Sequence, residues 1–261
     1  MELQVNGHPV HVAEHGIDPS RETVLFIHGS ACDHTVWVLP KRHFARHGLN
    51  SLAVDLPGHG HSGGAPLGSI EALSDWIVAL LDAAGLERAA LVGHSLGALV
   101  AYDCAARHPG RVRAAALLGP ALPMVVNDAL LGAAKANHHG AIDALNVWGH
   151  AYAAHLGGNP ASGRWNVGTV MRLMERAAPG VLHTDLSACN DYGAPLERAA
   201  DIACPVLLLL GEQDMLAPPR GTGQLAAALP DGRSVTIPGC GHFMLGERPE
   251  AVLDALRGFL L

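Results

Sequence analysis

Short apolar runs alternate along the chain with stretches whose apolar residues recur every three or four positions. The apolar runs occupy residues 24–28, 49–56, 89–92, 114–118, 206–210 and 234–237. Runs this short and this apolar predict strands buried on both faces of a sheet. Because these strands alternate with helices, the pattern predicts an α/β fold with a mostly parallel central sheet and helices on both faces. Before the first run, apolar and polar residues alternate around Asn6-Gly7, which predicts a β-hairpin.

The stretches between the apolar runs carry signals that begin and end helices. Apolar residues recur at helical spacing over residues 70–84, where Ser69 is placed as an N-cap and Gly85 as the end. Helices are also expected over residues 96–107 and after Pro249.

Residues 121–193 interrupt this alternation. Their apolar positions mark helical patches at residues 129–136, 141–155 and 167–177, joined by segments that contain Gly and Pro. None of their apolar runs is typical of a core strand. We therefore expect a helical lid, inserted between two strands and lying over the C-terminal edge of the sheet. The predicted domains are a core of residues 1–120 and 194–261 and a helical cap of residues 121–193.

Composition narrows the class of protein and of partner. Hydrophobic residues make up 49% of the chain and charged residues 16%, which is enough apolar material for a large core. The formal net charge of −7 argues against nucleic acid as a partner, because phosphate binding requires clustered Lys and Arg. The first residues lack a positive segment followed by an apolar run, and no apolar stretch is long enough to span a bilayer. We expect a cytoplasmic protein that acts on a small molecule, and the oligomeric state stays open.

Cysteines and histidines give no signal for a bound metal. The five cysteines are scattered without a C-x-x-C pair, which predicts buried thiols rather than disulfides or a zinc site. Cys240 is the closest of them to the histidine discussed next. The 17 histidines contain no H-E-x-x-H pattern, so we expect no metal and no cofactor.

The strongest chemical signal is the G-x-S-x-G sequence Gly93-His94-Ser95-Leu96-Gly97. A predicted strand precedes it and a predicted helix follows it. This context produces a strained turn that presents a serine hydroxyl at its apex, with glycines allowing close approach of the backbone. We therefore predict that Ser95 is a nucleophile.

A serine hydroxyl needs a base to remove its proton and an acid to orient that base. After a turn of this kind, the acid and then the base follow along the chain. The apolar run at 206–210 leads to Asp214, and a later run leads through a Gly-rich loop to His242. We predict that His242 is the base and Asp214 the acid, with Glu212 as the alternative acid.

A tetrahedral intermediate also requires hydrogen-bond donors for its oxyanion. One predicted donor is the backbone N–H of Leu96, at the start of the helix after the nucleophile. The other is the N–H of Ser30, in the loop that follows the first long parallel strand.

Together these segments resemble the lid-bearing form of the α/β-hydrolase family, from about residue 24 to the end of the chain. The resemblance rests on Phe26-Ile27-His28-Gly29, Asp55-Leu56-Pro57-Gly58-His59-Gly60-His61-Ser62, the nucleophile motif, Gly211-Glu212-Gln213-Asp214 and Gly241-His242-Phe243. The segment from Asp55 to Ser62 resembles a structural turn of the family, so His59 and His61 receive no role. Dehalogenases and epoxide hydrolases of the family carry an Asp where this chain has Ser95.

The resemblance implies a serine hydrolase that cleaves a carboxylic ester of a small to medium, largely apolar substrate through an acyl-enzyme. The alternatives are hydrolysis of a C–C bond next to a carbonyl, opening of an enol-lactone, and a ligand receptor built on a hydrolase scaffold. An apolar pocket is expected from the large side chains of the lid, namely Met124, Trp148, Tyr152, Trp165, Met171 and Met174. Arg164, Arg172 and Arg176 form no tight cluster in the sequence, which favours uncharged substrates.

Overall fold

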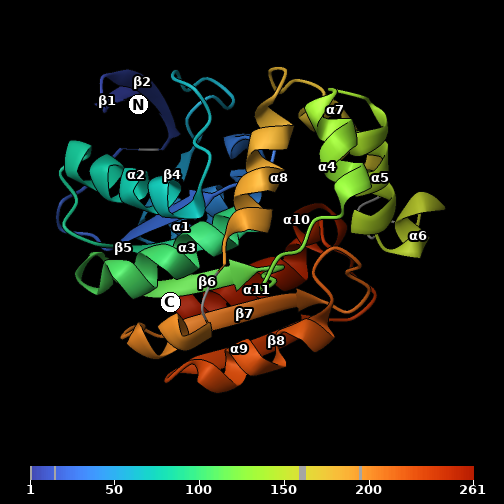
Figure 1. The fold of residues 1–261 in the computed structure, drawn as a ribbon. Coiled ribbons are helices and arrows are strands. Elements are labelled where there is room, and N and C mark those ends of the chain that lie inside the picture. The colour runs from blue at the N-terminus through green and yellow to red at the C-terminus, as the bar shows by residue number, and fades with distance from the viewer. Residues whose placement is uncertain (1, 15, 159–162, 194–195) are drawn as a thin grey trace.

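The computed structural model describes residues 2–14, 16–158, 163–193 and 196–261. Within these ranges, eight strands form one sheet in the order β1-β2-β4-β3-β5-β6-β7-β8 (Figure 1). The strands are β1 (Glu2–Val5), β2 (His8–Ala13), β3 (Thr23–Ile27), β4 (Asn50–Val54), β5 (Ala89–His94), β6 (Val112–Leu118), β7 (Val206–Gly211) and β8 (Gly232–Ile237). Strands β3 to β8 are parallel, and β1 and β2 are antiparallel to their neighbours. The predicted fold class is confirmed.

Helices cover both faces of this sheet. The α-helices of the described residues are α1 (Val38–Arg46), α2 (Ile70–Ala83), α3 (Leu96–Arg107), α4 (Asp128–Lys135), α5 (Gly140–Gly149), α6 (Tyr152–His155), α7 (Asn166–Met174), α8 (Val181–Asp191), α9 (Gly223–Ala228), α10 (Met244–Glu247) and α11 (Pro249–Leu260). Short 3₁₀ turns are η1 (His34–Trp37), η2 (Pro109–Arg111), η3 (Leu196–Asp201) and η4 (Pro219–Gly221).

The core lies in two layers because successive side chains of a strand point to opposite faces. In β3, Leu25 and Ile27 pack with α2 and α3, whereas Val24 and Phe26 pack with α1 and α11. The predicted N-cap Ser69 accepts a hydrogen bond from the Ala72 N–H at 3.2 Å. Both faces of the central strands are therefore buried, as their apolar sequences predict.

The two edges of the sheet differ from its centre. At one edge, Asn6 and Gly7 have φ values of 52° and 81° and join β1 to β2, so the predicted hairpin is confirmed. At the other edge, the expectation of a strand buried on both faces is wrong for β8. Of its residues only Ile237 is buried, because β8 has a neighbouring strand on one side alone.

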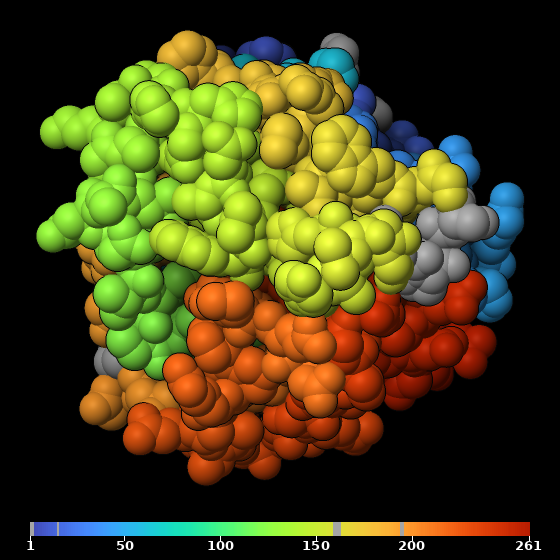
Figure 2. Space-filling model, turned by 90° about the vertical axis from the view of Figure 1, so that its right-hand side faces the viewer, coloured from blue at the N-terminus to red at the C-terminus, as the bar shows by residue number. Residues whose placement is uncertain are grey.

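Helices α4 to α8 lie between β6 and β7, and we call them the helical segment. Their apolar residues form a separate cluster that includes Leu145 and Leu186 and also contacts Phe243 of the core. In Figure 2 the helical segment (green to yellow) covers the upper part of the face, above residues that follow β7 (orange to red). Residues 1 and 194, which begin the two predicted core ranges, lie outside the described residues.

One prediction for this segment is wrong, and one of its helices was not predicted. The expected helix over residues 141–155 is two helices, α5 and α6, because His150 has extended backbone angles (φ −103°, ψ 143°). Helix α8 was not predicted at all.

Two expectations from the composition concern the cysteines and the membrane-spanning potential of the helices. All five cysteines are free and buried, as predicted. Burial raises the pKa of the Cys32 and Cys104 thiols to about 12, which keeps them protonated and unreactive. Among the described helices, none combines the length and apolarity needed to cross a bilayer.

Candidate active site

Ser95 occupies a strained turn between β5 and α3. Its φ of 57° and ψ of −118° lie outside the regions that a non-glycine residue normally adopts. The turn is tight enough to require both flanking glycines. A Cβ on Gly93 would lie 1.9 Å from the Gly97 carbonyl oxygen, and one on Gly97 would lie 2.3 Å from that of Ile27. The spacing of the G-x-S-x-G sequence therefore follows from backbone contact.

Backbone hydrogen bonds hold this turn in place. The Ser95 N–H donates to the Leu118 carbonyl at 2.9 Å, and the Ser95 carbonyl accepts from the Ala98 N–H at 2.8 Å. Leu96 is the first residue of α3, so its N–H has no acceptor within the helix. The partial positive charge of the helix N-terminus lies at the same point. An anion beside Ser95 would therefore be stabilised there.

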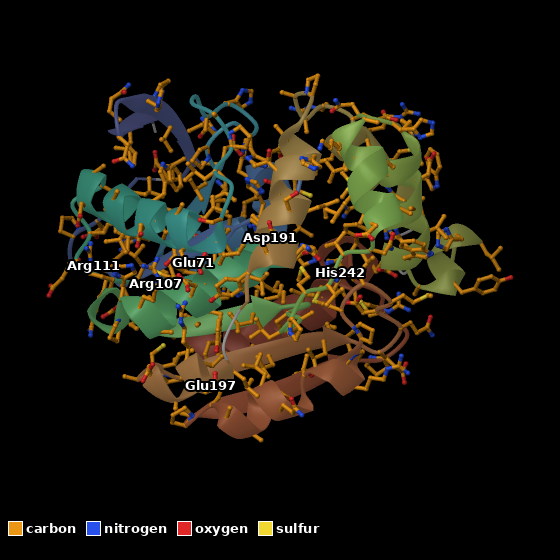
Figure 3. The ribbon with its side chains drawn as sticks, in the orientation of Figure 1. Glu71, Arg107, Arg111, Asp191, Glu197 and His242 are labelled. Atoms are coloured by element: carbon orange, nitrogen blue, oxygen red, sulfur yellow. The ribbon has the colours of Figure 1, made fainter. Side chains whose placement is uncertain are left out.

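His242 and Asp214 form a buried pair. The His242 Nδ1 lies 2.7 Å from Asp214 Oδ2, and the two side chains are 4% and 0% exposed. Asp214 Oδ1 accepts hydrogen bonds from the Leu216 and Ala217 N–H groups at 2.9 and 2.8 Å. The fixed carboxylate favours the tautomer with the proton on Nδ1, which leaves Nε2 free to accept a proton. Figure 3 shows His242 where the sheet meets the helical segment.

Glu212, the alternative acid, faces another direction. Its Oε2 accepts a hydrogen bond from the Gly239 N–H at 2.7 Å, and the side chain is exposed. The carboxylate that contacts His242 is therefore that of Asp214.

Three of the five predicted site residues meet at one small cavity. Ser30, Ser95 and His242 all line it, although they come from loops after β3, β5 and β8. The helical segment contributes apolar lining from the opposite side, namely Leu145, Met174 and Leu186. The carboxyl ends of parallel strands share one edge of a sheet, which is why residues so far apart in sequence converge.

The sequence matches a known protein family over most of its length. A family model described as "alpha/beta hydrolase fold" matches residues 22–249. The chain belongs to the α/β-hydrolase family. The pimeloyl-[acyl-carrier protein] methyl ester esterase of Aromatoleum aromaticum is 32% identical, with 92% of this chain and 100% of the esterase covered.

Solved structures of other family members have the same fold. The enol-lactonase of Burkholderia xenovorans LB400 superimposes with a TM-score of 0.88 at 23% identity, covering 100% of this chain and 99% of the lactonase. A thermophilic esterase superimposes with a TM-score of 0.81 at 27% identity, covering 100% and 96% of the two chains. The similarity to hydrolases supports a hydrolase activity for this α/β hydrolase.

The loop that carries Ser30 is held by a residue that the sequence analysis missed. Asp185 of α8 is 1% exposed, and its Oδ2 accepts a hydrogen bond from the Ala31 N–H at 2.8 Å. Ala31 directly follows Ser30 and has a φ of 51°. The Nε2 of His59 lies 2.9 Å from the same oxygen of Asp185. The helical segment therefore contacts the loop that carries the predicted Ser30 donor.

Both ring nitrogens of His59 face hydrogen-bond acceptors. Its Nδ1 faces the Pro57 carbonyl at 2.9 Å and its Nε2 faces Asp185, so both ring nitrogens can donate. Burial disfavours the charged ring, but the charge of Asp185 and the hydrogen bond to it outweigh burial and raise the pKa of His59. The carboxylate on α8 is thus paired rather than isolated.

His28 and His94, which also surround the loop, are neutral. Burial and the neighbouring His59 lower the pKa of His28 to about 4, and burial lowers that of His94 to about 3. The neutral His28 ring accepts a hydrogen bond from the Leu56 N–H at 3.1 Å. His94 hydrogen-bonds with the His242 carbonyl at 2.8 Å and so helps to position the loop of the predicted base.

A larger cavity of about 510 Å³ adjoins the small one, with Cys32, His94 and Phe243 lining both. Of the side chains predicted to line a pocket, Trp165 lines the larger cavity and Met174 the smaller. Met124, Trp148, Tyr152 and Met171 line neither cavity, and Tyr152 is 74% exposed, so the expected lining role is wrong for these four.

The arginines of the helical segment are closer together than the sequence suggested. Arg164, Arg172 and Arg176 all line the larger cavity, although they are separated in the sequence. Arg172 lies 2.5 Å from Glu175, and Arg176 lies 3.7 Å from Asp33. The guanidinium groups of Arg172 and Arg176 therefore each have a carboxylate beside them.

Proposed function

We propose that this α/β hydrolase cleaves a carboxylic ester of a small to medium, largely apolar substrate through an acyl-enzyme. The observation that supports the proposal best is the buried His242–Asp214 pair, whose histidine lines the same cavity as the strained Ser95. A serine in such a turn beside an imidazole oriented by a carboxylate is the arrangement required for acyl transfer.

In the proposed reaction, Ser95 Oγ attacks the ester carbonyl while His242 Nε2 takes its proton. Asp214 keeps the imidazole in the productive tautomer and stabilises its charged form. The N–H groups of Ser30 and Leu96 donate to the oxyanion. His242 then protonates the leaving alcohol, and water releases the acid by the same route.

We further propose that residues 121–193 act as a lid, while residues 1–120 and 194–261 form the core domain. The apolar residues of the helical segment that face Ser95 support this division, because they would exclude water from the acyl-enzyme. Trp165 of the larger cavity would then contact the bulk of the substrate. Substrate size and shape would be selected mainly by the helical segment.

The substrate proposal can be tested by comparing kcat/KM for a neutral acyl ester and the matching coenzyme A thioester. We expect the neutral ester to be preferred, because Glu175 and Asp33 lie beside two of the arginines at the cavity. Trp165→Ala should raise KM for an aromatic ester, whereas the control Tyr152→Ala should not. A clear preference for the thioester would contradict the proposal, and equal effects of the two variants would remove Trp165 from the binding site.

C–C bond cleavage and enol-lactone opening are the alternative activities, because the same serine, histidine and aspartate can perform them. A panel of esters, lactones and vinylogous diketones would distinguish these reactions. Binding without turnover of any of them would instead support a ligand receptor.

A further inference from the structure

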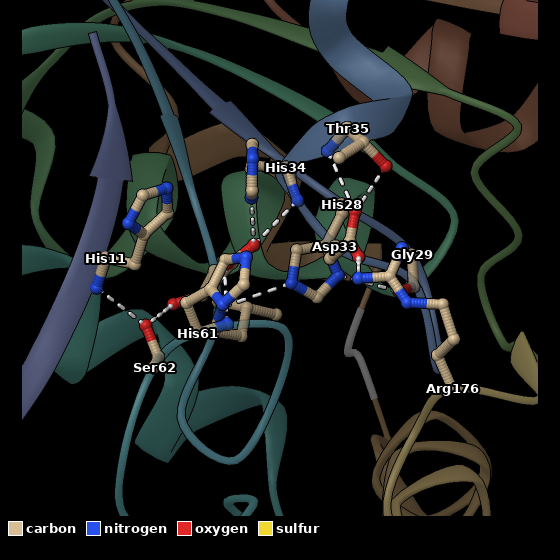
Figure 4. A network of polar contacts seen from close by, with 11 residues as sticks. His11, His28, Gly29, Asp33, His34, Thr35, His61, Ser62 and Arg176 are labelled. Carbon is tan, nitrogen blue, oxygen red and sulfur yellow. Dashed lines mark hydrogen bonds and ion pairs between the residues drawn. The ribbon is translucent and has the colours of Figure 1, made fainter. Parts of the chain in front are cut away.

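Three histidines that receive no role in the proposed hydrolysis lie together beside the N-terminal hairpin. His11 belongs to β2, His34 to η1, and His61 to the loop that follows β4. The ring centre of His11 lies 4.7 Å from that of His34 and 5.1 Å from that of His61, and those of His34 and His61 are 6.0 Å apart. Figure 4 shows the three rings side by side. Three imidazoles from separate segments therefore converge at one point.

A buried carboxylate orients one of these rings. Asp55 is 0% exposed, and its Oδ1 accepts hydrogen bonds from the backbone N–H and the Nδ1–H of His34 at 2.7 and 2.8 Å. Its Oδ2 accepts from the His61 N–H at 2.9 Å. With its proton on Nδ1, His34 keeps the lone pair of Nε2 free. A histidine held by a carboxylate in this way is the usual arrangement behind a metal ligand.

The spacing of the rings is compatible with tetrahedral coordination. Zinc binds imidazole nitrogen at about 2.0–2.1 Å, which puts the ring centres of neighbouring ligands about 5 Å apart at tetrahedral angles. The ring separations above bracket this value. Ligand atoms of His11, His34 and Asp55 already lie within 4.8 Å of one another. Because His61 is exposed, its ring is free to turn toward the other two.

We propose that His11, His34 and His61 bind one divalent transition-metal ion, with Asp55 hydrogen-bonded behind His34 and water in the remaining position. Three nitrogen ligands favour zinc or cobalt over magnesium and calcium, which prefer oxygen. None of the three histidines lines a cavity that contains Ser95 or His242. The ion would connect β2, η1 and the loop after β4. It would thereby join the hairpin to η1, which follows the loop that carries Ser30.

The test uses the full-length protein after treatment with a chelator. Cobalt is titrated in, and binding is followed by its visible absorption, whose intensity distinguishes four-coordinate from six-coordinate ions. We expect one cobalt per chain with a four-coordinate spectrum, displaced by one equivalent of zinc. His11→Gln combined with His61→Gln should weaken binding more than about tenfold. Asp55 itself is left unchanged, because it also holds the His61 turn.

A matched control is available in α1, where the rings of His43 and His47 stack with centres 3.9 Å apart. His43→Gln combined with His47→Gln should leave cobalt affinity unchanged. Melting temperatures of the metal-free variants check that each still folds. Undiminished binding in the His11/His61 variant, loss of binding in the control, or no stoichiometric binding by the unsubstituted protein would each overturn the proposal.

Discussion

The loops at the end of the sheet and the helical segment both line the cavity beside Ser95, but they contribute different groups. The loops carry Ser95, Asp214 and His242. Asp214 is held by backbone groups two and three residues away, whereas the His242 N–H donates to the Gly149 carbonyl of α5 at 2.7 Å. The helical segment supplies apolar side chains and one buried carboxylate, that of Asp185. Asp185 contacts Ala31, which lies 154 residues away in the sequence. Local hydrogen bonds therefore hold Asp214, while contacts between distant segments hold His242 and the loop that carries Ser30.

The largest expected effect comes from the loops. Ser95→Ala removes the nucleophile and keeps the backbone, so turnover should fall by about 10⁴-fold to 10⁶-fold. Hydrolysis of a chromogenic ester measures the loss, and circular dichroism checks the fold. If the folded variant kept a tenth of the original activity, Ser95 would not be the nucleophile.

A second substitution tests which carboxylate orients the base. Asp214→Asn should lower kcat by about 10⁴-fold, because an amide favours the wrong tautomer of His242. Glu212→Gln is the control, since Glu212 bonds to the Gly239 N–H instead. The opposite ranking of the two variants would assign the acid role to Glu212.

The helical segment should have a smaller effect on the chemical step. Asp185→Asn removes the carboxylate beside His59 and weakens the hold on Ala31, next to the Ser30 donor. We expect kcat to fall by about tenfold to a hundredfold, less than the loss of an oxyanion donor itself, with KM nearly unchanged. Asp191→Asn, at the exposed end of the same helix, is the control. A change in KM alone would indicate a role in binding rather than in positioning the donor.

The smallest predicted effect concerns stability at acid pH. Buried His28, His94 and His150 have lowered pKa values of about 4, 3 and 4, so the unfolded chain binds protons that the folded chain does not. Their contribution is complete above pH 6.5 and is lost as the pH falls toward 4. The raised pKa of His59 acts in the opposite sense, but its stabilisation is lost as the pH rises above 6.5 and is nearly constant between pH 6 and 4.

Urea denaturation at several pH values measures this dependence. The free energy of unfolding should decrease between pH 6.5 and 4, and His150→Phe should make the decrease shallower. The His150 ring packs against Phe243 with centres 4.8 Å apart, so an aromatic replacement suits the site. A profile that is flat over this range would contradict the buried neutral state of these rings.

The sequence predicted the loops better than the helical segment, and the reason is physical. A central strand is apolar throughout because both its faces are buried, and the turn at Ser95 needs glycines at fixed spacing. These signals are local. By contrast, the buried face of α8 includes Val181, Asp185 and Cys189, so a carboxylate interrupts the apolar stripe by which a helix is recognised. Its partners, Ala31 and His59, come from distant parts of the chain and leave no pattern around α8.

The same limit applies to the groups outside the proposed active site. The three arginines of the larger cavity are brought together by the turn before α7 and by the helix itself, and sequence spacing alone did not reveal this. His11, His34 and His61 likewise match no metal-binding motif, because each comes from a different element. The edge position of β8 depends on the strand order, which a run of four residues does not encode.

The strained backbone of Ser95 has a consequence for its conformational ensemble. Relaxing φ from 57° would release about 1–3 kcal/mol of strain. It would also break the hydrogen bond to the Leu118 carbonyl and those from the Ala98 and Leu99 N–H groups. Each buried group left without its partner costs about 1–3 kcal/mol, so the relaxed state is disfavoured. Ser95 therefore occupies a single backbone state, and substrate binding requires no population shift at the nucleophile.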